Sequence, residues 1–533
     1  MSIEKEYTVV VNNRDDLAQL ESELTASSGA GPIPARTVDI ANPRLGSRVQ
    51  THFMLTDDEA ETLRSDPRVR AVEIPPDQRD DIQIGLNRTQ EGVFYRGSGL
   101  DNSYVNWGLR RNIAETNVYG NATTTAGNYE YALDGTGVDV VIQDSGIDPD
   151  HPDWNDYNGV SRFQNINWYT ESGLPGTQSA NHYRDLDGHG SHCASIAAGL
   201  LYGTAKGAHI YSQKLAGLET LSGSDGTGIS ITDAFDTIRL WHNNKTNGRP
   251  TVVNMSWGYG STQTSNPVSG VYRGTSWTWG VDYTDRNVLW AATGVSPNLF
   301  SSGFTLFFRM PVRVASVDAE IEDMITDGIH ICIAAGNNLH KVDVPAGADY
   351  DNTVVFNTTN YTYHRGSSPY SLNAFMVGNI DSTTQLDGGT YRDKTAQSTT
   401  RGPGVNIFAP GSNIMAATSR NYDTGSYSVT TYPGNANFPI MSIGGTSMAS
   451  PQVAGVCAAH LQLLPNLTPA ELQTRMIGDT KSVMFSTGSD TDYATFNTSL
   501  MGAENRVLYN KYGRQPATIN NIGLSGGFTI NTN

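Results

Sequence analysis

Short apolar runs rich in β-branched residues alternate with segments of helical periodicity along most of the chain. The apolar runs at 138–144, 209–216 and 251–257 have the length and composition of buried strands. Amphipathic stretches near 229–242 and 316–327 have the spacing of helices. Strands and helices that alternate in this way are typical of a parallel sheet covered by helices on both faces. The pattern therefore predicts an α/β fold for the main part of the chain.

The first 78 residues follow a different order and predict a separate unit. Its expected strands and helices, in chain order, cover residues 7–11, 15–24, 48–55, 56–64 and 69–74. Thr56 and Glu59 have the spacing of a capping box at the start of the second helix, and Pro67 follows the end of that helix. Strands and helices mixed over so short a length predict a small α+β sandwich.

Shifts in composition set the remaining boundaries. Residues 79–105 are polar and irregular, which suits a linker or a processing segment. The main unit then covers residues 106–500, and the tail 501–533 is rich in Asn, Gly and Thr and has no readable role. Residues 259–314 form an aromatic-rich insertion, which we interpret as a satellite core in preference to a binding surface. Its aromatic residues include Trp277, Trp279, Tyr283, Trp290, Phe300, Phe304, Phe307 and Phe308.

Charge and cysteine content narrow the class of protein. The formal net charge is −18, without long acidic runs, which argues against nucleic acid or an anionic membrane as a partner. No apolar run reaches the roughly 18 residues of a membrane-spanning helix. The N-terminus lacks the pattern of a secretory signal, which favours a role inside the cell or particle that makes the protein over classical secretion. Cys193, Cys332 and Cys457 are odd in number and are expected to be reduced core residues.

The most informative stretch is 443–464, which reads IGGTSMASPQVAGVCAAHLQLL. Small and apolar residues follow Ser447 for four turns without a charge, which predicts a buried helix with a serine in its first turn. The unpaired N–H groups at a helix N-terminus would stabilise an oxyanion formed beside that serine. The simpler alternative is a core helix with a Ser/Thr cap, so a chemical role depends on partners elsewhere.

Three further segments supply such partners. Asp144 ends the strand 138–144, and His189 lies between two glycines just before a helix of small residues. Asn337 ends the apolar run 328–338, where its carboxamide could form half of an oxyanion hole. A serine nucleophile needs a base within reach and an acid that orients the base. Each residue alone has a structural explanation as a turn or cap residue, and only their joint occurrence favours chemistry.

The words around these residues are DSGI, HGSHCA, AAGN and GTSMASP, in the order Asp144, His189, Asn337, Ser447. In wording and order the chain resembles the subtilisin-like serine proteases, over roughly residues 1–480. The resemblance implies a serine endopeptidase that works through an acyl-enzyme. It assigns Ser447 as nucleophile, His189 as general base and acid, Asp144 as orienting acid and Asn337 as oxyanion donor. No cofactor is required for this chemistry, and a structural calcium ion is left open, without identified ligands.

The resemblance also implies the substrate-binding residues. Gly226, Thr227 and Gly228 are expected to form an exposed edge strand that pairs with the substrate. Ser256, Trp257 and Gly258 are expected to form the facing strand. Ala334, Ala335 and Gly336 are expected to form a further wall of the primary pocket. Trp257 departs from the smaller residue usual in the family. Asn338 and Leu339 are expected near the floor of the primary pocket and offer no carboxylate. We therefore expect cleavage after large apolar or aromatic residues of protein or peptide substrates.

The end of the first unit resembles in sequence the inhibitory propeptide of many subtilisin-like enzymes. The matching stretch reads HFMLTDDEAETLRSDPRVRAVEIPPD. The resemblance implies that residues 1–78 assist folding, inhibit the enzyme and are removed by self-processing. An unrelated ferredoxin-like module is the alternative for this unit. The catalytic unit itself is expected to have the α/β fold with a parallel sheet and helices on both faces.

Three rival interpretations remain for the whole chain or its site. A sedolisin-type acid peptidase would need acidic residues where His189 and Asn337 stand. A catalytically silent subtilisin-fold scaffold or virion component would not need the intact catalytic residues. His189, His192 and Cys193 could also suggest a metal site, but the triad interpretation already uses His189 and the chain has no other zinc-ligand spacing.

Overall fold

The computed structural model describes residues 3–26, 31–34, 36–79, 83–86, 96, 105–125, 129, 131–218, 225–297, 307–422, 428–488 and 493–512. Most of the predicted linker 79–105 and of the tail 501–533 lies outside the described residues, as do Phe300 and Phe304. No helix in the described ranges is long and apolar enough to cross a membrane.

The N-terminal unit is a four-stranded antiparallel sheet with two helices. Its strands, in spatial order, are β2 (Ile40–Asn42), β3 (Gln50–Leu55), β1 (Lys5–Val11) and β4 (Val69–Glu73), and its helices are α1 (Arg14–Leu24) and α2 (Asp57–Arg64). Thr56 caps α2, and Glu59 completes the predicted capping box with the Thr56 N–H. The unit has an apolar core made only of its own residues, among them Val9, Phe53 and Leu63. It ends in the 3-10 turn η1 (Pro76–Gln78).

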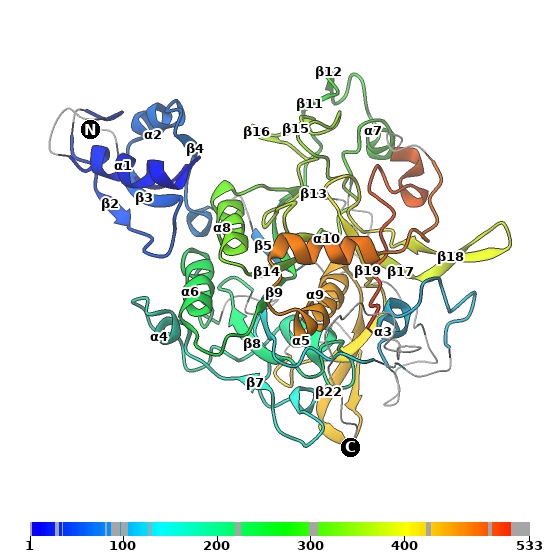
Figure 1. Ribbon diagram of the computed structural model, residues 1–533. Coiled ribbons are helices and arrows are strands. Elements are labelled where there is room, and N and C mark those ends of the chain that lie inside the picture. The colour runs from blue at the N-terminus through cyan, green and yellow to red at the C-terminus, as the bar shows by residue number, and fades with distance from the viewer. Residues whose placement is uncertain are drawn as a thin grey trace.

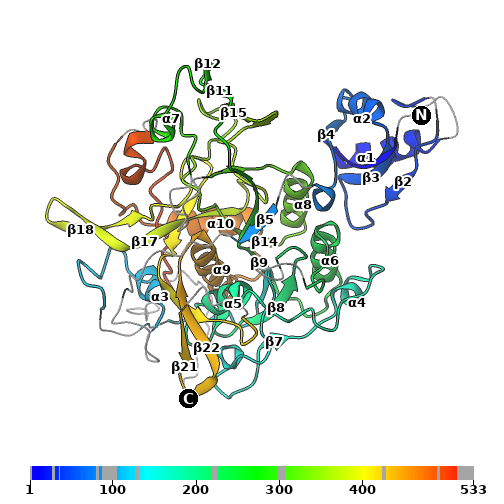
Figure 2. The same ribbon diagram turned by 180° about the vertical axis from the view of Figure 1, so that it is seen from behind.

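The main unit is built on a largely parallel sheet. Its strands, in spatial order, are β18 (Thr390–Thr395), β17 (Phe375–Asp387), β14 (His330–Ala334), β9 (Thr251–Met255), β6 (Asp139–Asp144), β8 (His209–Lys214) and β7 (Phe163–Gln164), with β19 (Ile407–Pro410) paired to β17. Only the β17–β18 pair is antiparallel, and this hairpin projects from the body (Figure 2). The strand pattern read from the sequence is confirmed.

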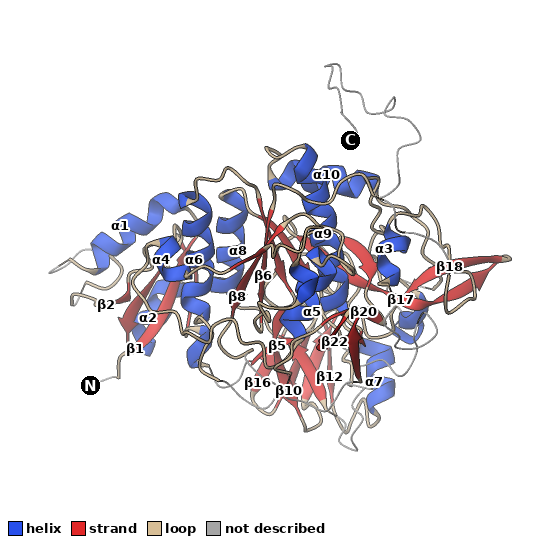
Figure 3. Cartoon of the chain, turned by 90° about the horizontal axis from the view of Figure 1, so that it is seen from below, coloured by secondary structure: helices blue, strands red, loops and turns tan. Residues whose placement is uncertain are grey.

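Helices cover both faces of this sheet, as the alternation of strands and helices predicts. One layer contains α3 (Trp107–Asn112), α5 (His189–Ala198), α9 (Thr446–Leu463) and α10 (Pro469–Asp479), and the other contains α4 (Trp168–Ser172), α6 (Ile231–Asn244) and α8 (Ala315–Thr326). Figure 3 shows β6 and β8 between α5 and α9 on one side and α6 and α8 on the other. Val140 and Ile142 of β6 belong to the core with α5 and α9, whereas Val141 belongs to the core with α6. This alternation is the two-residue period of a strand buried on both faces.

Three small sheets surround the central one. They contain β20 (Ile414–Ala417), β22 (Asn435–Ile443) and β21 (Val429–Tyr432); β13 (Phe308–Pro311), β10 (Trp257–Gln263) and β5 (Gln83–Leu86); and β12 (Thr275–Thr278), β11 (Ser269–Tyr272), β15 (Thr353–Phe356) and β16 (Thr359–Tyr361). The aromatic insertion supplies β11, β12, α7 (Arg286–Thr293) and β13. Trp277 and Phe308 are buried in the second core, and Trp290 packs near Phe496 of η3 (Tyr493–Thr498). Trp277 and Phe308 therefore act as core, in a cluster shared with the central sheet, whereas Trp279, Tyr283, Trp290 and Phe307 are half-buried. The short 3-10 turn η2 (Pro152–Trp154) follows β6.

The N-terminal unit packs on the helical layer of α6 and α8. Strands β1 and β4 contact α8, and η1 contacts α6. Figure 1 shows the unit in blue beside these two helices. The N-terminal unit is therefore docked on the main unit.

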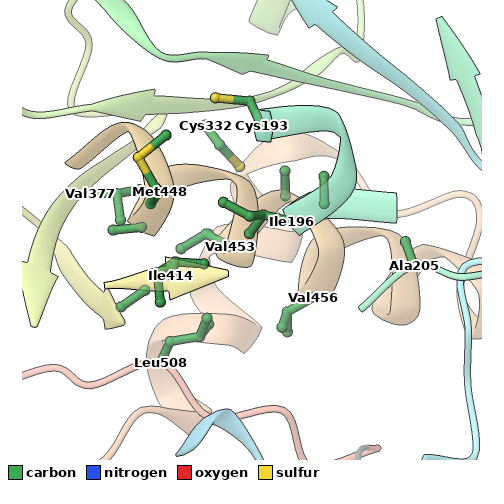
Figure 4. Packing of buried hydrophobic residues seen from close by; sticks show 14 of the residues in the cluster. Cys193, Ile196, Ala205, Cys332, Val377, Ile414, Met448, Val453, Val456 and Leu508 are labelled. Atoms are coloured by element: carbon green, nitrogen blue, oxygen red, sulfur yellow. The ribbon is translucent and has the colours of Figure 1, made fainter. Parts of the chain in front are cut away.

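The three cysteines are free and buried, as predicted. Cys193 lies on α5, Cys332 on β14 and Cys457 on α9, and all three belong to the same core. Figure 4 shows Cys193 and Cys332 in this core. The sulfur atoms of Cys332 and Cys457 are 3.8 Å apart and remain unbonded. Burial raises the pKa of the Cys457 thiol, which keeps it protonated.

Candidate active site

Ser447 is the second residue of α9. Strand β22 leads into Gly444 and Gly445, and Gly445 precedes the helix with a φ of 152°, which favours glycine. The N–H of Gly445 donates to the carbonyl of Gly411 at 2.8 Å, which fixes the chain just before the helix. All of α9 from Thr446 to Leu461 is buried. The sequence thus places a serine at the positive end of a long, rigid, buried helix.

His189 begins α5 because an external carboxylate caps that helix. Gly188 precedes His189 with a φ of 80° and has no side chain that could cap. Asp185 takes over, since its Oδ1 accepts from the Gly188 N–H at 2.8 Å and its Oδ2 from the Ser191 N–H at 3.0 Å. Burial raises the pKa of Asp185, while these hydrogen bonds favour its charged form. Sequence reasoning did not identify Asp185, although it stands four residues before His189.

Asp144 and His189 form a buried pair. Nδ1 of His189 lies 2.8 Å from Asp144 Oδ1 and 3.1 Å from Oδ2, and the Ser145 N–H donates to Oδ1 at 2.7 Å. Because the carboxylate accepts the Nδ1 hydrogen, Nε2 is left as the acceptor that a general base requires. Nε2 is buried and has no hydrogen-bond partner within the described part of the chain.

Ser447 lies close to this pair but its hydroxyl donates elsewhere. Ser447 Oγ donates to the carbonyl of Ser256 at 3.2 Å. The Cys193 thiol lies 3.8 Å from His189 Nδ1 and 3.4 Å from the Ser447 carbonyl, so it links the two residues. Hydrogen bonds of catalytic groups often form only once substrate is bound. Transfer of the Ser447 hydrogen to His189 thus requires the hydroxyl to leave the Ser256 carbonyl.

Asn337 presents an unpaired donor beside the start of α9. Its Oδ1 accepts from the backbone N–H of Thr446 at 2.9 Å and from Thr446 Oγ1 at 3.1 Å. This arrangement orients the carboxamide so that Nδ2 points away, and Nδ2 is buried without a partner among the described residues. A held amide with a spare N–H is suited to bind a developing oxyanion. Thr446, which fixes this amide, was not identified from the sequence, although it directly precedes Ser447.

The fold brings these residues to one edge of the central sheet. Asp144 ends β6, Ser256 follows β9 and Asn337 lies beyond the end of β14, and these three strands are neighbours. In parallel sheets ligand sites lie beyond the carboxyl ends of the strands. Asp144, His189 and Ser447 have no exposed surface, and Asn337 is 8% exposed. The site is therefore formed and covered at the same time.

The predicted substrate-binding edge at Ser256, Trp257 and Gly258 is already occupied by a strand of the same chain. Ser256 joins β9 to β10, and β10 pairs antiparallel with β5. In this register Leu86 lies opposite Trp257 and Gly85 opposite Gly258. The indole of Trp257 is buried between Phe235 and Tyr259, at 6.4 and 5.9 Å between ring centroids, so it fills the core beside this edge.

The structure assigns no strand at Gly226, Thr227 and Gly228, where the backbone bends, and their role in substrate binding stays a prediction. Asp225 accepts from the Thr227 N–H at 3.1 Å and from its hydroxyl, and Gly226 has a φ of 70°. An Asx turn of this kind removes the extended backbone that strand pairing needs.

The remaining predicted wall follows β14. Ala334 ends the strand, and Ala335 and Gly336 continue beyond it. The Gly336 N–H donates to Thr446 Oγ1 at 3.1 Å, and Gly336 has a φ of 113°. This wall is therefore tied to the start of α9.

One group of side chains in the described part of the chain is compact enough to hold a metal ion. The ligand atoms of Asp144, His189 and Cys193 all lie within 4.8 Å of one another. The same Asp144 and His189 atoms form the acid–base pair described above, so a metal ion would displace the Nδ1 hydrogen from that pair. The predicted His192 does not join the group, because its Nε2 contacts the carbonyl of Met441 at 3.1 Å.

Comparison with known proteins matches the site and its surroundings to one family. The family model described as the subtilase family matches residues 135–500. Subtilisin-like protease 3 of Saccharomyces cerevisiae is 24% identical over 474 residues, which cover 86% of this chain and 69% of that protein. Alkaline serine exoprotease A of Vibrio alginolyticus is 25% identical over 455 residues, which cover 85% of this chain and 57% of that protein. The crystal structure of a cold adapted subtilisin-like serine proteinase aligns with 77% of this chain and 99% of its own, at 20% identity and a TM-score of 0.45.

Proposed function

The chain belongs to the subtilase family and is a serine endopeptidase, and we propose that Ser447 is its nucleophile. The observation that carries this proposal is the buried Asp144–His189 pair, whose unpaired Nε2 lies in the same site as Ser447 and the spare Asn337 N–H. A base with an open acceptor and an amide with an open donor are the two groups that acyl transfer by a serine requires.

The proposed reaction uses these groups in sequence. Ser447 Oγ attacks the substrate carbonyl carbon while His189 Nε2 accepts its hydrogen, and the C–O bond of a tetrahedral intermediate forms. Asn337 Nδ2 and the N-terminus of α9 stabilise the oxyanion, and Asp144 stabilises the imidazolium. The imidazolium then donates its hydrogen to the leaving amine, the C–N bond breaks and an acyl-enzyme remains. Water, deprotonated by His189, hydrolyses the acyl-enzyme and returns Ser447.

Residues 1–78 are proposed to inhibit the enzyme until the chain is cut. Two contacts support this proposal. Strand β5, which follows the N-terminal unit, occupies the edge of β10 that a substrate strand would use. The unit itself is held on α6 and α8, where Glu73 accepts from the N–H groups of Ala315 and Ser316 at the start of α8, at 3.3 and 2.7 Å. Self-processing is proposed within the segment that follows Leu86.

The proposed specificity is for large apolar or aromatic residues before the cut bond. Leu339 is fully buried against Tyr493 and Phe496, and Asn338 is half-buried and neutral. The next two acids along the chain are Asp343 and Asp349, which lie 3.7 and 2.7 Å from Lys341, and Asp349 also lies 2.6 Å from Arg273. Carboxylates that are already paired offer no free partner to a substrate cation. Peptide-library profiling at moderate salt tests this, and dominant cleavage after Arg or Lys would refute it.

Self-processing is tested by gel electrophoresis of the purified protein. Wild type is expected as two fragments, whereas Ser447→Ala stays at the full mass of 57.5 kDa. N-terminal sequencing of the large fragment is expected to begin after Leu86. Equal mobility of wild type and Ser447→Ala would show that the chain does not cut itself.

A further inference from the structure

The backbone carbonyl of the proposed nucleophile lacks its usual partner within the helix. In an α-helix the carbonyl of residue i accepts from the N–H of residue i+4. Four residues after Ser447 stands Pro451, which has no N–H. The carbonyl of Ser447 therefore cannot form the helical hydrogen bond that would normally fix the Ser447–Met448 peptide unit.

Two side chains from other elements donate to this carbonyl instead. Ser256 Oγ, from the connection between β9 and β10, donates at 3.1 Å, and Cys193 Sγ, from α5, donates at 3.4 Å. Both side chains are fully buried. Ser447 returns a bond to the first of them, since its hydroxyl donates to the Ser256 carbonyl at 3.2 Å.

A second layer of hydrogen bonds orients the Ser256 hydroxyl. Ser450 Oγ donates to Asn254 Oδ1 at 2.8 Å, and Asn254 Nδ2 donates to Ser256 Oγ at 2.9 Å. A hydroxyl has a single hydrogen, and because the Ser256 oxygen already accepts from Asn254, that hydrogen is directed to the Ser447 carbonyl. These hydrogen bonds form a continuous series in which each donor points onward, from Ser450 of α9 to Asn254 of β9, then to Ser256, and back to the Ser447 carbonyl of α9.

We infer that Ser256 and Cys193 are positioning residues for the nucleophile. Ser256 and Cys193 hold the carbonyl of Ser447 and thereby fix the Ser447 backbone. A fixed backbone sets the position from which Ser447 Oγ moves between the Ser256 carbonyl and His189 Nε2. Small displacements of a reacting group cost up to about 100-fold in rate, so these bonds act on the chemical step. The inference rests on the proposed role of Ser447. It adds a side-chain role for Ser256, whose main chain lies at the substrate-binding edge, and a role for Cys193 beyond packing.

The test compares kcat and KM on one peptide substrate. Ser256→Ala is expected to lower kcat roughly 10-fold and to leave KM within about 2-fold, because the main chain of Ser256 is unchanged. Cys193→Ala is expected to lower kcat roughly 3-fold, while Cys193→Ser, which keeps a donor, stays near wild type. Ser212→Ala is the matched control, because it deletes a buried hydroxyl that has no partner among the described residues. It should not change kcat.

A second background makes the test specific. Pro451→Ala restores an N–H four residues after Ser447, so the Ser447 carbonyl regains a helical donor. In that background the loss caused by Ser256→Ala should shrink to below about 3-fold, a coupling that a purely structural role would not produce. If Ser256→Ala does not fold, as judged by its melting temperature, Cys193→Ala and Cys193→Ser with and without Pro451→Ala give the same comparison.

Unchanged kcat in Ser256→Ala, or an equal loss in both backgrounds, would overturn the inference while Ser447→Ala remained inactive. Residual full activity of Ser447→Ala would instead refute the proposed function itself.

Discussion

Arg44 is the side chain on which binding of the N-terminal unit to the main unit is expected to depend most. It reaches from the loop before β3 to the helical layer, where Nη2 lies 2.7 Å from Glu320 Oε1 and Nε lies 3.2 Å from Asp236 Oδ2. Its side chain is 4% exposed, and both carboxylates are equally buried. The pair is therefore a desolvated charge contact between the two units.

The expected loss of binding free energy in Arg44→Met follows from the burial of these charges. Loss of one partner of a buried, hydrogen-bonded charge pair costs about 2 to 5 kcal/mol, mostly because the other charge remains buried and unpaired. At about 1.4 kcal/mol per factor of ten, Arg44→Met should raise the inhibition constant of added residues 1–78 roughly 30- to 5,000-fold. Arg239 lies 3.5 Å from Glu320 and 3.8 Å from Asp236, so it still partly neutralises both carboxylates when Arg44 is removed.

The assay titrates residues 1–78 against the cleaved, active enzyme and follows peptide hydrolysis. The segment has its own apolar core, and its circular dichroism spectrum confirms folding before use. Arg70→Met is the matched control, because Arg70 is an exposed residue of β4 and its loss removes the same charge. The control should stay within about 2-fold of wild type. A folded Arg44→Met segment that inhibits within about 3-fold of wild type would show that binding of the N-terminal unit does not depend on Arg44.

Two further predictions concern the site and its regulation. Asn337→Ala should lower kcat with little change in KM, because the spare N–H of Asn337 acts on the transition state. The expected loss is roughly 10²- to 10³-fold, a magnitude borrowed from subtilisin. Steady-state kinetics measure it, and an unchanged kcat would remove Asn337 from the oxyanion hole. Burial and the neighbouring Asp236 raise the pKa of Glu320 from 4.5 to about 7, although Arg44 lowers it, and release of the N-terminal unit removes the part of that burial which Arg44 and Gln50 supply. The covered state then binds more protons than the released state, so affinity for residues 1–78 should fall as pH rises through about 7. Inhibition that is independent of pH, or that Glu320→Gln leaves equally pH-dependent, would contradict this linkage.

The fold could be predicted from the sequence because its local and long-range preferences agree. Strand β6 reads as apolar at every position because both of its faces are buried, and the Thr56 capping box marks the start of α2 where the structure places it. The bend at Gly226 had a local signal, because Asp225 precedes a glycine and bonds the N–H of Thr227 two residues on. The resemblance to the family implied a strand at these residues and overrode that signal.

The candidate site could be predicted only as a set of residue types. The motifs indicate Ser447, His189, Asp144 and Asn337, and the strand order explains why they meet. The hydrogen bonds of Thr446 and Ser256 could not be predicted, because each depends on residues distant in the chain that packing brings together. The bonds of Asp185 are local, to Gly188 and Ser191, and follow from the cap that α5 needs. The pairing of β5 with β10 joins segments more than 150 residues apart and has no local signal in the sequence.

The central claim, that Ser447 is an activated nucleophile, is tested most directly by a fluorophosphonate probe followed by mass spectrometry of the labelled peptides. One adduct, on Ser447, is expected in the cleaved wild-type enzyme, and none in Ser447→Ala or His189→Ala of confirmed fold. Labelling that persists in Ser447→Ala, or a cleaved, folded wild type that takes up no probe, would contradict it.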